Sequence, residues 1–244
     1  MKGVTILAIR PIIFSDEMVR AILDGRKTQT RRPIKPQPIL HSPIGIAGQQ
    51  IEPIDDNTNM WAVYINKRPA IWDIYRNAFK CPYGKVGDTL WVRETWADVN
   101  SENGPAILYR AGQHYHFCVD DAYPVEYERY PNCQFTMWCG DLLRGESGHN
   151  WRSSIHMPKW ASRITLEIIN IRVERLWEIS EMDARMEGIE PSETVMMKDG
   201  SPCYTLPFRK LWTDIYGIDN PKSWDANPYV WVIEFICPAD TPTP

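Results

Sequence analysis

Residues 163–188 read RITLEIINIRVERLWEISEMDARMEG, a long strand pattern followed directly by a helix start signal. The apolar residues fall into two sets, Ile164, Leu166 and Ile168, then Ile169, Ile171 and Val173. Each set alternates with the period of a half-buried strand, but the two sets are out of phase. A β-bulge adds one residue to a strand and restores the burial pattern after such a slip. We therefore predict one long strand with a bulge near Ile168 and Ile169.

The second half of this stretch predicts a short helix. Ser180 and Asp183 have the spacing of a capping box, and Gly188 is a natural stop. Glu187 falls in the last turn, where the helix dipole disfavours a carboxylate. This placement is expected if a cation holds the group, and the alternative is an exposed helix glutamate.

Downstream, the pattern predicts another helix and a final strand. Five apolar residues share helical spacing between Pro207 and Gly217: Phe208, Leu211, Trp212, Ile215 and Tyr216. The stretch Tyr229 to Cys237 is apolar on both faces except for Glu234, as expected of a central strand.

Upstream, shorter elements complete an α+β chain. A helix is predicted after the cap residue Ser15 and before Gly25. Strands are predicted at Val4 to Ile9, Trp61 to Ile65, Ile71 to Tyr75, Thr89 to Thr95 and Ala106 to Arg110, with loops over 112–160. Non-local strands with three short helices indicate one α+β domain around a small barrel.

Composition limits the class of protein. The 244 residues are 43% hydrophobic and 24% charged, which excludes disordered, collagen-like and coiled-coil chains. The longest apolar runs fall far below the ~20 residues of a membrane span, and no signal peptide is visible. We expect a cytosolic protein, in which the six cysteines are reduced thiols, because no C-x-x-C pair occurs.

Positive charge is concentrated in one segment. Residues 25–51 contain five basic residues and no acid, so the net charge of -4 leaves -9 on the rest of the chain. This distribution favours a local anionic ligand over a long duplex. The alternative is a solvated basic loop.

Residues 25–32, GRKTQTRR, can also carry chemistry. The Thr30 hydroxyl becomes a nucleophile only if a base removes its proton. Lys27 is such a base if burial and nearby cations lower its pKa. A turn must then separate Lys27 from Thr30, since an extended strand would direct them to opposite sides. The alternative is a basic strand facing water.

Other candidate sites are weaker. In a strand, His114, His116 and Cys118 share a face near Asp120 and Asp121, a possible metal site. We interpret this stretch as a loop and assign no metal and no cofactor. The 11 Trp, 11 Tyr and 6 Phe include rings able to stack on a nucleobase, with Trp91, Trp96, Trp151 and Trp160 nearest the irregular regions. No P-loop, G-x-S-x-G or H-E-x-x-H motif occurs.

Together these motifs resemble the ASCH domain family, whose fold is a PUA-like small β-barrel with flanking short helices. The resemblance begins in Met18 to Arg32, close to the family's G-x-K-x-x-T-x-R signature, and continues through VGDTLWVRE at 86–94. It resumes at Arg163 to Gly188 and Tyr229 to Cys237. The long form, with Trp151 to Arg163, is similar to ASCH proteins of bacteriophages and prophages.

The resemblance implies one domain over residues 1–244, with insertions at about 33–80 and 98–160. Some compact family members hydrolyse the amide of N4-acetylcytidine, and their lysine, threonine and glutamate correspond to Lys27, Thr30 and Glu187. Lys27 would activate Thr30, while Glu187 would orient Lys27 or protonate the leaving amine. Arg26, Arg31 and Arg32 would bind the substrate.

Three functions therefore remain open: an RNA-base or nucleoside amidohydrolase, a non-catalytic module that binds RNA or a modified nucleoside, and a phage accessory protein. The last would hold a protein partner through the insertions. A member of this family would act in the cytoplasm of a bacterial host if phage-encoded, without contact with a membrane.

Overall fold

The computed structural model describes residues 7–38, 49–54, 59–65, 68–69, 78–118, 129–145 and 150–238. These residues form two compact units, each built from several chain segments. The first unit comprises the described parts of 1–8, 25–89 and 167–236, and the second those of 9–24, 90–166 and 237–244.

The first unit contains two groups of antiparallel strands. One has the order β11-β12-β2, formed by Thr165–Arg175, Tyr229–Ile236 and Gln29–Pro33, with the first two residues of β11 in the second unit. In the other, β4 (Met60–Ile65) pairs with β3 (Gln49–Pro53), β5 (Arg68–Pro69) and β6 (Phe79–Lys80). The helices are α3 (Glu181–Met186) and α4 (Thr205–Tyr216), with a 3-10 turn at Leu176–Glu178.

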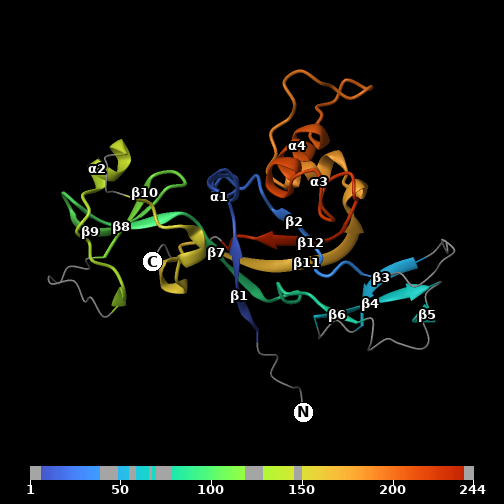
Figure 1. Cartoon of the computed structure of the whole chain (residues 1–244), viewed down its shortest axis with the longest axis horizontal. Coiled ribbons are helices and arrows are strands. Elements are labelled where there is room, and N and C mark those ends of the chain that lie inside the picture. The colour runs from blue at the N-terminus through green and yellow to red at the C-terminus, as the bar shows by residue number, and fades with distance from the viewer. Residues whose placement is uncertain are drawn as a thin grey trace, which may run out of the picture. The chain divides into compact units, whose positions relative to one another are not determined.

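Helices α3 and α4 lie together on one face of β12 and β2 (Figure 1). The apolar core between them consists of Leu176, Ile179, Ala184, Phe208, Trp212, Val230 and Val232. Val230 and Val232 are fully buried and are two residues apart on β12, so one face of the strand provides both. This helix-covered face is where the polar network described below is found.

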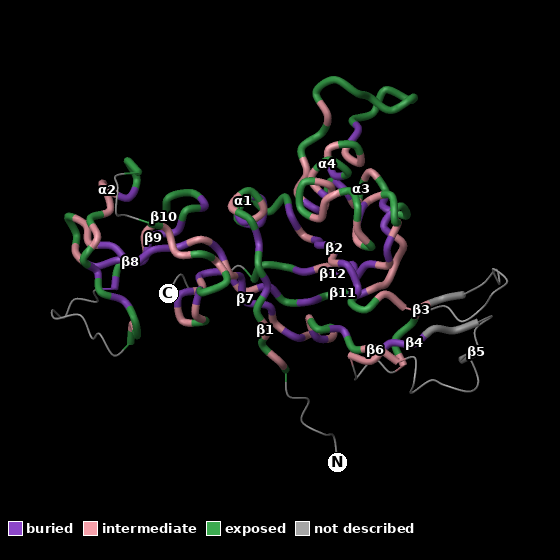
Figure 2. Tube along the Cα trace, viewed as in Figure 1, coloured by how far each residue is buried: buried purple, intermediate pink, exposed green. Residues whose placement is uncertain are grey.

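The predicted central strand is confirmed as β12, which pairs with β11 on one side and β2 on the other. It is buried along most of its length, in contrast to the exposed segment before α4 (Figure 2). The predicted bulge is also confirmed, because the β11–β12 register shifts between Ile168 and Asn170. Ile168 and Ile171 therefore both stay buried, although they are three positions apart, an odd number.

The predicted capping signals act as expected. Ser180 accepts a hydrogen bond from the backbone N–H of Asp183, whose side chain accepts from the N–H of Ser180, so α3 begins with a capping box. Helix α1 (Asp16–Leu23) is capped by Ser15, and Gly25 follows with a φ of 72°. Such a left-handed conformation favours glycine and ends the helix.

The second unit contains β1 (Ile9–Ile13) beside β7 (Thr89–Arg93), whose first residue belongs to the first unit, together with α1. A separate sheet has the order β10-β9-β8, formed by His114–Phe117, Gly104–Tyr109 and Trp96–Ser101. Helix α2 (Cys139–Arg144) and two 3-10 turns, Ser154–His156 and Lys159–Ala161, complete this unit. The interpretation of 112–160 as loops was therefore wrong for β10 and α2, whose short sequences lack a clear period.

The α+β class is confirmed: sheets dominate, the helices are few and short, and the described strands form no closed barrel. The single domain with two insertions stays a prediction. Of the predicted strand Val4 to Ile9, residues 1–6 lie outside the described residues, and Ile9 begins β1. The predicted strand Ile71 to Tyr75 also lies outside them. None of the described helices has the length and hydropathy needed to cross a membrane.

Candidate functional site

Residues 26–28, which lie between Gly25 and β2, are held to the C-terminus of α3 by backbone hydrogen bonds. The backbone N–H of Thr28 donates to the carbonyl oxygen of Met186 at 2.9 Å, and Lys27 forms an antiparallel bridge with Glu187. The N–H of Phe235 in β12 donates to the Thr28 carbonyl at 2.9 Å. These backbone contacts fix Lys27 opposite the last residues of the capped helix.

Lys27 and Glu187 form a buried ion pair. The Lys27 Nζ donates to Glu187 Oε2 at 2.8 Å, to the Glu187 carbonyl at 2.9 Å and to the Gln29 carbonyl at 2.8 Å. The lysine side chain has no exposed surface, and the glutamate side chain is 5% exposed. Glu187 therefore has the cation that its position at a helix C-terminus predicts.

Burial lowers the pKa of Lys27, because removing an ammonium group from water disfavours its charged form. The carboxylate of Glu187 opposes this effect, and the positive charges of Arg32 and Arg31 add to it. A lysine with a lowered pKa is a better candidate for a proton acceptor than an exposed one.

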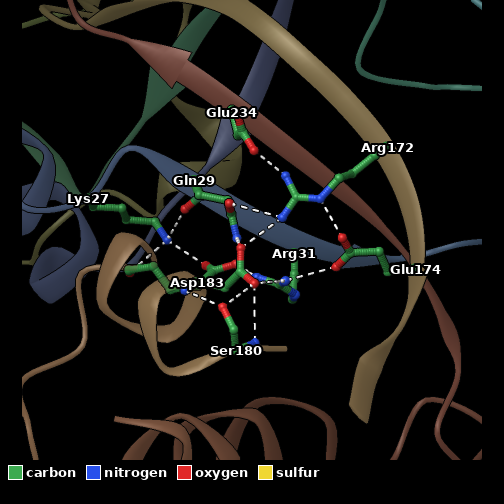
Figure 3. A network of polar contacts seen from close by, with 9 residues as sticks. Lys27, Gln29, Arg31, Arg172, Glu174, Ser180, Asp183 and Glu234 are labelled. Atoms are coloured by element: carbon green, nitrogen blue, oxygen red, sulfur yellow. Dashed lines mark hydrogen bonds and ion pairs between the residues drawn. The ribbon is translucent and has the colours of Figure 1, made fainter. Parts of the chain in front are cut away.

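Arg31 extends this ion pair into a network (Figure 3). Its guanidinium lies 3.0 Å from the Glu174 carboxylate, 3.4 Å from Asp183 and 3.5 Å from Glu187. The Arg31 side chain has no exposed surface. A cation so enclosed by carboxylates stabilises the junction of β2 and α3.

Arg172 on β11 contacts two of the same carboxylates, those of Asp183 and Glu174 (Figure 3). It donates to Asp183 at 2.7 Å and pairs with Glu174 and Glu234. Burial alone would raise the pKa of Asp183, but hydrogen bonds from Ser180 and the charge of Arg31 lower it to about 2. Asp183 therefore caps α3 and joins two arginines.

The remaining predicted site residues lie elsewhere. Side chains alternate along a strand, so Thr30 and Arg32 are directed to the face of β2 opposite Gln29 and Arg31. Thr30 is buried and pairs in register with Ile233. Arg26 is half exposed and pairs with Glu190 at 2.9 Å. The structure therefore brings together Lys27, Glu187 and Arg31, directs the Thr30 and Arg32 side chains to the other face of β2, and pairs Arg26 with Glu190.

Arg32 lines a pocket of about 370 Å³, here called the Arg32 pocket. Its other basic lining residues are Lys35 and Lys80, and its aromatic lining residues are Phe79, Tyr83, Tyr216 and Trp231. Among the described residues that line it, none is acidic. The pocket therefore combines positive charge with aromatic surface.

Tyr216, the last residue of α4, lines the Arg32 pocket and interacts electrostatically with Glu187. Burial raises the pKa of the Tyr216 hydroxyl, Arg32 opposes this through its charge and a hydrogen bond, and the Glu187 charge adds to it. Tyr216 thus interacts with both Arg32 and Glu187. Burial also raises the pKa of Tyr83, which Arg32 opposes.

The possible metal site is not assembled in the part of the chain that the structure describes. No group of three or more His, Cys, Asp or Glu residues lies there with the geometry of a metal site. His114 and His116 are on β10 and Cys118 follows it, whereas Asp120 and Asp121 lie outside the described residues.

Sequence reasoning missed the aromatic residues of the Arg32 pocket. The four tryptophans singled out do not line it, and Trp91 and Trp96 are buried at 7% and 2% exposure. It also missed Arg172 and Glu174 as members of the network, although charged residues within a buried strand can indicate a buried polar network. Glu234, the single charged residue in an apolar strand, was an indication of this kind.

No protein-family model, curated protein or solved structure matches this chain.

Proposed function

We propose that this chain recognises RNA or a modified nucleoside through the Arg32 pocket, to which the basic segment 26–32 contributes Arg32. One observation carries the proposal, namely that cationic and aromatic side chains line the same pocket. Ligand pockets typically enclose roughly 300–1,000 Å³, so a pocket of about 370 Å³ suits one small ligand. A single nucleobase is of this size class.

The chemistry of the lining also supports a nucleobase. Stacking of a base on an aromatic side chain contributes about 1–3 kcal/mol and occurs with every base. Tyr83 and Tyr216 add hydroxyl groups that can bond to polar base edges. Arg32 adds a cation that stacks on base rings or binds a carbonyl.

The proposal includes membership of the ASCH family and a PUA-like fold. It is supported by the order of elements around the motif, in which α1 precedes residues 25–32 and β2 begins two positions after Lys27. Strand β7 follows the turn at Gly87 and Asp88, as the second motif predicts.

Amide hydrolysis of an N4-acetylcytidine-type substrate is the second candidate. The observation that favours it is the buried Lys27–Glu187 pair, in which burial lowers the pKa of the lysine. Lys27 would remove the Thr30 proton, and the Thr30 oxygen would attack the acetamide carbonyl. Arg32 or a backbone N–H near Gly25 would stabilise the oxyanion, and Glu187 would orient Lys27 or protonate the leaving amine. Water would then cleave the acetyl–Thr30 ester, releasing acetate and restoring the Thr30 hydroxyl.

Recognition ranks above hydrolysis for a geometric reason. The reaction needs Lys27 to reach the Thr30 hydroxyl, whereas Lys27 bonds to Glu187 and Gln29, and strand alternation directs Thr30 to the other face. Binding in the Arg32 pocket requires no such rearrangement.

The test is a calorimetric titration of the full chain with N4-acetylcytidine and with a 12-nucleotide single-stranded RNA. We expect at least one of them to bind, and Tyr216→Leu to weaken binding by about 5-fold or more, as loss of one stacked base implies. Arg209→Met, which changes an exposed arginine outside the Arg32 pocket, is the matched control. Absence of binding by both ligands to the folded protein would overturn the proposal.

Hydrolysis is tested separately by following cytidine release from N4-acetylcytidine by chromatography. Thr30→Val removes the proposed nucleophile but keeps the branched shape that β2 accommodates. Turnover in the wild type that is lost in Thr30→Val would support hydrolysis. Binding of N4-acetylcytidine without turnover would support recognition and exclude hydrolysis of this substrate.

A further inference from the structure

We propose that the Arg32 pocket binds a phosphorylated nucleoside, with the base inside the pocket and the phosphate between Lys35 and Lys80 at its mouth. This inference rests on the proposed function and specifies its ligand. The phosphate can belong to a free mononucleotide or to an RNA strand, and the experiment below separates these sources.

The pocket has a buried end and an exposed end. Trp231 is 1% exposed and packs against Phe79, with ring centroids 5.5 Å apart. Lys35 and Lys80, in contrast, are exposed. An aromatic floor with cations at the rim matches a ligand that is aromatic at one end and anionic at the other.

The rim cations have no carboxylate to neutralise them among the described residues. The structure gives no ion pair for Lys35, Lys80 or Lys222, whereas Lys27, Arg31, Arg163 and Arg172 all bind carboxylates. Surface lysines usually stay apart or pair with acids. An anion from solution can neutralise this rim.

A fourth cation adds to the charge at this rim. An interaction with the neighbouring Lys222 lowers the pKa of Lys35. Neighbouring ammonium groups repel each other, and an anion bound beside them relieves this repulsion. A phosphate has enough acceptor oxygens to bind both groups.

A nucleotide fits these features better than a phosphorylated peptide does. A peptide phosphate would use the rim cations but would leave the aromatic floor without a matching group. A free nucleoside would use the floor but would leave the rim cations without an anion. The combination therefore points to one ligand that carries both groups.

The experiment compares the four ribonucleosides with their 5′-monophosphates by calorimetric titration of the full chain at fixed ionic strength. We expect at least one monophosphate to bind 10-fold or more tightly than its nucleoside. Lys35→Met and Lys80→Met should each reduce that ratio by 3-fold or more. Both residues are exposed, so these variants should fold. Lys198→Met, an exposed lysine outside the pocket, is the matched control.

A 12-nucleotide single-stranded RNA identifies the source of the phosphate. The phosphate belongs to an RNA strand if RNA binds more tightly than any monophosphate. In that case the slope of log affinity against log salt concentration should fall in Lys35→Met by the amount expected for about one phosphate contact. Equal or weaker binding of RNA indicates a mononucleotide.

Three results would overturn the inference. If nucleosides and monophosphates bind equally, the phosphate subsite is wrong while the proposed function stands. If inorganic phosphate or a phosphoserine peptide binds as tightly as the best monophosphate, the site selects anions and not nucleotides. If neither nucleosides, monophosphates nor RNA bind, the proposed function fails as well.

Discussion

The Lys27 Nζ lies 2.8 Å from the Glu187 carboxylate, and the two residues are 160 positions apart in the chain. Both side chains are buried, so each charge depends on the other for compensation. This pair joins the start of β2 to the end of α3. It therefore contributes to stability whether or not the site performs chemistry.

Replacing Lys27 with Met is expected to lower the free energy of unfolding by about 3–5 kcal/mol, because the Glu187 charge is left buried without its closest partner. Lys27→Met combined with Glu187→Gln should be less destabilising than the sum of the two single changes, by about 0.5–3 kcal/mol. Urea unfolding of the four proteins measures this coupling. Arg26→Met, which removes an exposed pair with Glu190, should cost about 0–1 kcal/mol. Strict additivity of the two buried substitutions would contradict the prediction.

Asp183 should make the protein sensitive to acid. Its pKa of about 2 lies below the ordinary value of 3.8, so its stabilisation is complete above about pH 4 and disappears as the pH falls through 2. Asp183→Asn should be less stable by about 1.5–3 kcal/mol at pH 6, as for a hydrogen bond to a charged group. The stability of this variant should also change less than that of the wild type between pH 4 and pH 2. Urea unfolding across this range measures both effects, with the exposed Glu193→Gln as control. Parallel wild-type and Asp183→Asn curves would show that Asp183 does not cause the acid sensitivity.

Arg163 in the second unit should not tolerate lysine. Its guanidinium donates to both oxygens of the Glu94 carboxylate at 2.9 Å and to the Ala111 carbonyl at 2.8 Å. It also lies 4.3 Å from the centre of the Tyr109 ring. Lysine cannot reproduce this two-point geometry, so Arg163→Lys should cost about 1.5–3 kcal/mol. Thermal unfolding provides the measurement, and Arg110→Lys, at an arginine whose side chain is 49% exposed, is the control. Equal losses in both variants would argue against the prediction.

The cysteines should differ in reactivity with a thiol reagent. Burial raises the pKa of Cys118 to about 11 and that of Cys133 to about 12, and the thiolate is the reactive form. Cys237 is exposed. At pH 8 we therefore expect rapid labelling of Cys237, which Cys237→Ser abolishes and Cys118→Ser leaves unchanged. Labelling of Cys118 and Cys133 should require urea. Mass spectrometry of peptides from briefly labelled native protein identifies the modified cysteines. Rapid modification of Cys118 would refute the predicted order of reactivity.

The parts of the fold that depend on local sequence could be predicted. The cap at Ser180 and Asp183 acts within one helical turn. The change of phase in the apolar pattern near Ile168 is itself the sign of a bulge. Glu187 was notable for its unfavourable position, but no local pattern identifies a partner 160 residues away. The resemblance to a family supplied that pairing, and the structure places the two side chains in contact.

The pocket could not be predicted, because its walls come from separate parts of the chain. Phe79 and Tyr83 lie near one strand end, whereas Tyr216 ends α4 and Trp231 belongs to β12. Each of these residues is an ordinary aromatic in sequence. Only pairing of strands distant in sequence brings them together, and composition carries no information on that pairing.

The bulge in β11 makes Ile169 an extra residue that has no partner in the register between β11 and β12. Ile168 pairs with Phe235 and Asn170 pairs with Glu234, and the Ile169 side chain is 45% exposed. Deleting Ile169 would therefore leave a strand with unbroken alternation, in which Ile171 keeps its partner on β12 and Arg172 stays on the helix-covered face. An extra or missing residue between Asn170 and Arg172 would instead reverse the alternation and turn the Arg172 side chain away from Asp183. In a lineage of such proteins, this strand should tolerate both substitution and loss at position 169 but no change of length just after it.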